Sequence, residues 1–137
     1  MNNKNTQTGE IHLKKYDCTK IKNLAVAGHA GSGKTSLCEA LLYKSGASDR
    51  LGKVLDGNTV SDYNAEEIKR KCSIYTSLSS FEKDDFKVNL LDTPGLFDFA
   101  GEMMEGIFAS GSVLITVSGK SGVKVGTHKA YDYAVET

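Results

Sequence analysis

Gly28-His-Ala-Gly-Ser-Gly-Lys-Thr35 is the stretch that determines the fold of this 137-residue sequence. It fits the pattern G-x-x-x-x-G-K-[ST], a glycine-rich loop that wraps the phosphates of a nucleoside triphosphate. The apolar segment 21–27 precedes the loop and predicts a strand, whereas 36–45 follows it and predicts a helix that ends at Gly46. Strand, glycine loop and helix in this order are the context in which the pattern binds phosphate.

The residues of this loop have separate physical tasks. Three glycines allow the backbone to curve so that successive N–H groups point at phosphate oxygens. The helix start near Lys34 adds its positive end and a full positive charge, and the Thr35 hydroxyl can ligate Mg²⁺. We therefore expect the whole run to bind the nucleotide: Gly28, His29, Ala30, Gly31, Ser32, Gly33, Lys34, Thr35 and Ser36.

The composition is that of one globular domain without unusual charge. Apolar residues make up 39% of the chain, and 17 basic residues balance 17 acidic ones, so no charge excess predicts a nucleic-acid surface. The apolar runs are too short to span a membrane, and three cysteines without metal-binding spacing suit reduced thiols in the cytoplasm. We expect a cytoplasmic protein with a polar arm over residues 1–20 and a nucleotide-binding domain over 21–137.

Two alternating segments predict an antiparallel hairpin at one edge of a sheet. Residues 73–78 and 86–91 alternate between apolar and polar types, and only the short charged link 80–85 separates them. The continuous apolar run 112–117 predicts a further strand, buried on both faces.

Two helices complete the expected fold. Residues 98–109 are weakened as a helix by two glycines, and 124–136 place Val125, Ala130 and Tyr133 inward. We expect an α/β fold of the phosphate-loop type: a doubly wound, mostly parallel sheet of order 2-3-1-4, with strands near residues 73, 86, 22 and 112.

A second motif, Asp92-Thr-Pro-Gly95, follows a predicted strand. On its own it is a turn that ends the strand, but after a phosphate loop it fits the D-x-x-G pattern of switch GTPases. There the aspartate holds a water on Mg²⁺, and the glycine N–H meets the γ-phosphate. We expect nucleotide contacts from Asp92, Thr93, Pro94 and Gly95, and catalytic roles for Lys34, Asp92 and Gly95.

These motifs, taken in order, resemble elongation factor G and its relatives among the translational GTPases. The resemblance covers residues 20–136 and includes the phosphate loop, Asp56-Gly57, Asp62-Tyr63 with Glu66-Glu67, Arg70-Lys-Cys-Ser-Ile74 and Asp92-Thr-Pro-Gly-Leu-Phe-Asp-Phe-Ala-Gly-Glu102. It implies GTP and GDP as ligands, Mg²⁺ as cofactor, and action on the ribosome. In the family pattern R-G-[IV]-[ST]-I, Ser73 takes the place of the hydroxyl that closes over Mg²⁺, so the implied metal ligands are Thr35, Ser73 and Asp92.

Three departures from the family pattern matter for the function. Leu96 replaces the histidine of D-T-P-G-H, and an alkyl side chain cannot position a water. Gly31 stands where an aspartate is common. The guanine-reading motif N-K-x-D is absent, so we expect a partial GTP-binding domain, truncated after the third major helix and without the guanine-specificity segment.

Three functional hypotheses follow from the sequence. The first is a GTPase domain that uses hydrolysis to drive a ribosome-coupled conformational change. The second is a GTP-binding switch that hydrolyses poorly because of Leu96 and acts as a regulatory binder. The third is a phosphate-loop ATPase or small-molecule kinase. A kinase needs an acceptor site, which the sequence does not clearly supply, and the ordered switch motifs disfavour this hypothesis.

Overall fold

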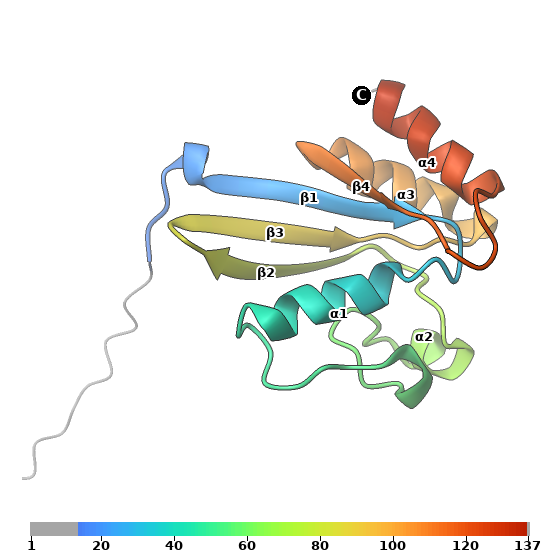
Figure 1. Cartoon of the computed structure of the whole chain (residues 1–137), viewed down its shortest axis with the longest axis horizontal. Helices are drawn as coiled ribbons and strands as arrows, with labels where there is room; N and C mark the ends of the chain where they lie inside the picture. Colours follow the sequence, from blue (N-terminus) through green and yellow to red (C-terminus); the bar gives the residue numbers. More distant parts are fainter. Residues whose placement is uncertain (1–13, 137) are drawn as a thin grey trace, which may run out of the picture.

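A computed structural model describes residues 14–136, which form a four-stranded sheet with helices on both faces (Figure 1). The strand order is β2-β3-β1-β4. β1 pairs in parallel with β3 and with β4, and β2 runs antiparallel to β3. The predicted fold class, strand order and edge hairpin are therefore confirmed. The strands are β1 Ile21–Gly28, β2 Ser77–Lys83, β3 Phe86–Asp92 and β4 Ser112–Thr116.

The helices divide between the two faces of the sheet. Figure 1 shows α1 and α2 on one side and α3 and α4 on the other. α1 contacts β1 and β3, whereas α4 contacts β1, β4 and α3. No helix within the described range 14–136 is both long and apolar enough to cross a membrane. The helices are α1 Lys34–Lys44, α2 Ala65–Arg70, α3 Ala100–Phe108 and α4 Val125–Glu136, with single 3-10 turns η1 Cys18–Lys20, η2 Val54–Asp56 and η3 Phe97–Phe99.

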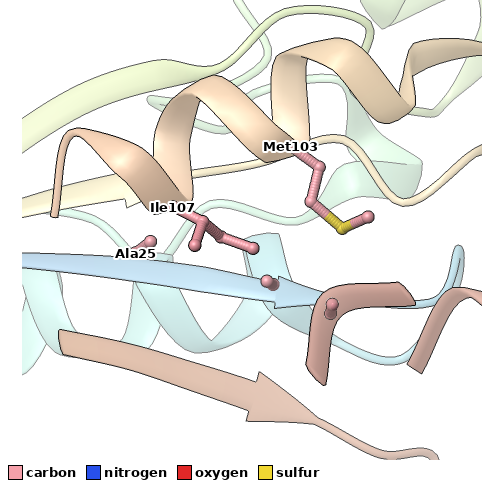
Figure 2. Close-up of a cluster of buried hydrophobic side chains, with 5 residues drawn as sticks. Ala25, Met103 and Ile107 are labelled. Carbon is pink, nitrogen blue, oxygen red and sulfur yellow. The ribbon is translucent and has the colours of Figure 1, made fainter. Parts of the chain in front are cut away.

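The main core lies between β1 and the helices α3 and α4 (Figure 2). Alternate residues of β1 point to this face, which places Ala25 and Ala27 against Met103 and Ile107 of α3. The alanines are small enough for the helices to approach the strand closely. The opposite face of β1 carries the fully buried Val26 under α1. β1 is thus covered on both sides, and this fixes the position of the loop at its end.

The hairpin strand begins later than the sequence predicted. We expected residues 73–78 to be a strand, but β2 begins at Ser77 and continues through most of the charged link. The reason is that the N–H groups of Ile74 and Tyr75 donate to the Glu67 carboxylate at 2.9 and 3.1 Å. These backbone groups are already satisfied before the ladder begins, so the segment does not need a strand partner.

Two predictions about burial were wrong. β4 is covered on one face only: Val113 and Ile115 pack against the core beside α4, whereas Leu114 on the other face is 39% exposed. Val125 is 64% exposed because it stands in the first turn of α4, whereas Ala130 is fully buried and Tyr133 packs against the core as expected.

The predicted N-terminal arm, residues 1–20, lies mostly outside the described residues. Its described end runs along the hairpin, where the Lys14 ammonium donates to Glu82 at 2.8 Å. The Lys20 ammonium lies 4.7 Å from the centre of the Phe86 ring.

Candidate nucleotide-binding site

The glycine loop joins β1 to α1 in a backbone conformation that side chains rarely adopt. Its φ angles are 137° at Gly28, 72° at Gly31 and 97° at Gly33. At Gly28 a Cβ atom would also lie 2.5 Å from the carbonyl oxygen of Thr116 in β4. Glycine is therefore needed here both for the left-handed turn and for close packing against the neighbouring strand.

The start of α1 is open to an anion. Gly33 is the N-cap and provides no side-chain hydrogen bond, so the first N–H groups of the helix keep their donor capacity. A cavity of about 220 Å³ lies against this end. Its lining comes from the loop, α1, the segment before β2 and the D-x-x-G turn: Ala30, Gly31, Gly33, Lys34, Thr35, Ser36, Val54, Asp62, Lys71, Cys72, Ser73, Gly95 and Leu96.

Lys34 provides a positive charge that is largely shielded from water. The side chain is only 6% exposed, and its ammonium donates to the carbonyl of His29 at 3.1 Å. Burial lowers the pKa of Lys34, and the charge of Asp92 opposes this shift. Gly95 approaches so closely that a Cβ atom there would collide with the Lys34 ammonium and with the Ala30 backbone. The two sequence motifs therefore meet at the Lys34 ammonium.

Three predicted metal ligands gather beside this lysine. The hydroxyls of Thr35 and Ser73 lie 3.2 Å apart, although the residues are 38 positions apart in the chain. Asp92 is 1% exposed, and neither of its carboxylate oxygens has a hydrogen-bond partner among the described residues. Burial raises the pKa of Asp92 to about 6, while the nearby hydroxyls and the Lys34 ammonium act in the opposite direction. A buried carboxylate without a partner is costly, and a cation or its water would relieve that cost.

The structure adds Asp62 to the predicted site. Asp62 lines the cavity and is 4% exposed, and its Oδ1 has no hydrogen-bond partner among residues 14–136. Burial raises the pKa of Asp62. No periodicity marks this residue in the sequence, because it lies in an irregular loop. Its place in the motif order was the only signal that pointed to it.

Magnesium fits this set of ligands better than a softer metal would. Within the described part of the chain, no three His, Cys, Asp or Glu side chains form a metal-binding group. The donors present are hydroxyl and carboxylate oxygens beside a phosphate-binding loop. Mg²⁺ is usually held by one or two carboxylates together with water and substrate phosphates.

The loop that carries Asp62 and Ser73 is held in place by carboxylates from helices. We call residues 52–76 the carboxylate-held segment. Glu39 of α1 is fully buried and accepts hydrogen bonds from the N–H groups of Gly52 and Val60. At the other end, the Thr76 N–H donates to the Glu102 carboxylate of α3 at 2.8 Å.

Glu67 holds the middle of the same segment. It is 2% exposed and accepts from Ile74 and Tyr75, the two residues that follow Ser73. Its other oxygen accepts from the Asn64 N–H at 3.1 Å, which completes a capping box at the start of α2. The Glu67 carboxylate therefore helps to position the residues that follow Ser73.

Lys71 has an unusual backbone conformation at the wall of the cavity. Its φ is 55°, in the left-handed region, and it forms the C-cap of α2. Glycine is the common residue at such a helix end, and another residue there is uncommon. Sequence reasoning missed Lys71 because the charged run around it is typical of a solvated surface.

Other predicted site residues lie behind the cavity and support it. The Thr93 N–H and hydroxyl both donate to the Val26 carbonyl, at 3.2 and 2.9 Å, and Pro94 is buried beside it. The Ser32 hydroxyl lies 2.6 Å from the Thr116 hydroxyl. These contacts fasten the two motifs to the sheet. Gly28, His29, Ser32, Asp92, Thr93 and Pro94 do not line the cavity itself.

A second cavity adjoins the first through Leu96. It measures about 270 Å³ and lies between the start of α3 and the first turn of α4. Leu96 lines both cavities and is 37% exposed. The second cavity is mainly apolar, with the Lys129 ammonium placed 3.9 Å from the centre of the Phe97 ring at its rim. The leucine thus stands where the cavity beside the glycine loop meets an apolar cavity.

Comparison with known proteins identifies relatives over most of the chain. Residues 19–137 match the family described as Elongation factor Tu GTP binding domain. The chain is 36% identical over 127 residues to the mitochondrial ribosome-releasing factor 2 of Drosophila yakuba, covering 93% of this chain and 18% of that protein. It is 41% identical over 108 residues to tetracycline resistance protein TetO of Campylobacter jejuni, covering 79% and 17%.

A solved structure supports the same similarity. A crystal structure of a protein from Thermus thermophilus superposes with a TM-score of 0.83 at 42% identity, covering 85% of this chain and 18% of that one. The chain spans less than a fifth of the length of each of these relatives.

Proposed function

The chain belongs to the family of elongation factor Tu GTP-binding domains, as an elongation factor G-like translational GTPase domain, and on this premise we propose that it binds GTP and GDP with Mg²⁺ and hydrolyses GTP to drive a ribosome-coupled conformational change. One observation carries the proposal. Gly95, Lys34 and the Thr35–Ser73 hydroxyl pair converge on one cavity at the open end of α1.

In this proposal the loop binds the phosphates through backbone N–H groups and through Lys34. Thr35, Ser73 and Asp92 would hold Mg²⁺, and the ion would neutralise negative charge on the phosphates. The N–H of Gly95 meets the γ-phosphate, so its position depends on whether that phosphate is present. Because the Gly95 turn leads directly into η3 and α3, loss of the γ-phosphate would release the start of that helix.

Leu96 favours a second candidate, a GTP-binding switch with slow turnover. The side chain lines the nucleotide cavity but cannot donate or accept a hydrogen bond, so it cannot orient the attacking water. In this alternative the protein acts through its GTP-bound shape, as a binder on the ribosome or on a regulatory partner.

Nucleotide binding is the first test. Calorimetric titration with GTP, GDP and ATP, with Mg²⁺ and with EDTA, should give binding that requires Mg²⁺ for full strength. The titration with ATP tests the base specificity, because the sequence lacks an N-K-x-D motif. Lys34→Ala should weaken GTP binding about a hundredfold, the order expected when a buried charge-assisted contact is lost. A wild-type protein that binds no nucleotide would contradict the proposal.

Turnover separates the two candidates. Phosphate release from GTP is measured for the wild type and Leu96→His, alone and with ribosomes. If the wild type turns over many times only with ribosomes, another group replaces the missing histidine and the first candidate stands. If the wild type binds GTP but is inert, and histidine restores turnover, the second candidate stands.

A reducing compartment such as the cytoplasm fits the free Cys18, Cys38 and Cys72.

A further inference from the structure

Lys71 brings a second positive charge to the wall of the nucleotide cavity. Of the described residues that line this cavity, only Lys34 and Lys71 are cationic, and they belong to different elements. Lys34 is buried and already donates to the His29 carbonyl. Lys71 is exposed and forms no ion pair with any acidic side chain in the described range. One cation is thus fixed in the site, and the other is free to bind an anion.

The backbone at Lys71 gives no structural reason for a lysine. Its φ of 55° is a conformation that glycine adopts without strain and that other residues rarely adopt. The side chain fills no core position, because the residue is exposed. Strain that persists at the wall of a binding site is a reason to look for a function of the side chain.

The segment that carries Lys71 adjoins the predicted Mg²⁺ ligands. Lys71, Cys72 and Ser73 form one wall of the cavity, and the Ser73 hydroxyl contacts Thr35. The Lys71 ammonium rests beside Gly57, where a Cβ atom would be 3.0 Å from it. Its four-carbon stem is flexible, so the ammonium can move from Gly57 into the cavity when an anion enters.

We propose that Lys71 is a phosphate-binding residue that contacts the terminal phosphate of GTP from the wall opposite the glycine loop. This rests on the proposed function, since it assumes that a nucleoside triphosphate occupies the cavity. The contact makes the carboxylate-held segment sensitive to the γ-phosphate through charge, in addition to the Mg²⁺ bound by Ser73. It also gives the protein a source of preference for GTP over GDP.

The test compares GTP and GDP affinities of three variants by calorimetric titration. Lys71→Gly removes the charge and also relieves the backbone strain, so it should melt at or above the wild-type temperature. It should bind GTP about tenfold more weakly and GDP less than about twofold more weakly. Lys71→Arg keeps the charge and should retain GTP binding. Lys69→Ala, which removes a lysine of the same helix that does not line the cavity, should bind like the wild type.

Two results would overturn the inference. One is a Lys71→Gly variant that binds GTP as the wild type does. The other is a variant that loses GTP and GDP affinity equally, because the contact would then not involve the terminal phosphate. These results leave the proposed function intact as long as the wild type binds GTP and Lys34→Ala binds it about a hundredfold more weakly. Absence of nucleotide binding by the wild type would overturn both.

Discussion

The glycine loop and the carboxylate-held segment form two walls of one cavity, but they are built in different ways. The loop is shaped by local backbone conformation, with glycines in the left-handed region between a buried strand and a helix. The segment 52–76 contains only short helical elements, η2 and α2, and six of its backbone N–H groups donate to the carboxylates of Glu39, Glu67 and Glu102. A wall built from local conformation is rigid without ligand, whereas one held by a few carboxylates can change when one contact is lost.

The largest effect on the free energy of unfolding is expected from a substitution in the glycine loop. Gly28→Ala should lower the free energy of unfolding by about 4 kcal/mol, since it combines backbone strain with a collision against the Thr116 carbonyl. Urea denaturation measures it. Gly31→Ala is the matched control, because its φ of 72° imposes strain but no atom lies within 4 Å of the new Cβ. It should cost only about 1 kcal/mol. Equal costs for the two variants would show that strain, and not close packing, dominates.

The second prediction concerns the carboxylate-held segment. Glu67→Ala removes the acceptor of three backbone N–H groups and should lower the free energy of unfolding by about 3 kcal/mol. Hydrogen exchange should rise first at Ile74 and Tyr75. Glu66→Ala is the control, since its ion pair with Arg70 is exposed on both sides and should contribute less than about 0.5 kcal/mol. A Glu67 variant as stable as the Glu66 variant would show that water replaces this carboxylate without loss.

The third prediction asks whether the two walls meet at a metal ion. Ser73→Ala removes one of the two hydroxyls that lie 3.2 Å apart. The affinity for GTP in Mg²⁺ should fall about tenfold, or about 1.4 kcal/mol. In EDTA the wild type and the variant should bind GTP equally. If the variant is weaker in EDTA as well, Ser73 contacts the nucleotide itself.

The smallest effect is expected at a glycine that lies outside both walls. Gly101 lies exposed in α3, and a Cβ atom there would meet nothing within 4 Å. Gly101→Ala should raise the free energy of unfolding by about 0.7 kcal/mol, because alanine restricts the unfolded chain and favours helix. Gly106→Ala, in the same helix, should destabilise instead, since its Cβ would lie 2.7 Å from the Thr93 methyl group. The same sign for both variants would contradict this assignment.

The difference between the walls also explains what the sequence could predict. The phosphate loop, the strand order and the hairpin depend on local pattern and chain direction, and all were predicted from the sequence. The start of β2 was not, because Glu67 occupies the N–H groups of Ile74 and Tyr75 from outside any ladder. Only the folded chain brings that carboxylate to these groups.

The site residues also divide into those that the motifs predicted and those that only the folded chain brings together. The motifs predicted that Lys34 and Gly95 act together, and the structure places them in contact. Asp62 and Lys71 join the cavity only through the path of the carboxylate-held segment. An irregular path has no period in the sequence, so neither residue could be assigned to the cavity from pattern alone.

Leu96 lines two cavities at once, so a substitution at this position affects both of them. A larger or smaller side chain at this position changes the volume on both sides together, because close-packed surroundings transmit a change in size. A small apolar molecule bound between α3 and α4 would press on the same side chain that lines the cavity beside the glycine loop. We therefore expect substitutions at position 96 to change both the rate of nucleotide turnover and the binding of ligands in the apolar cavity.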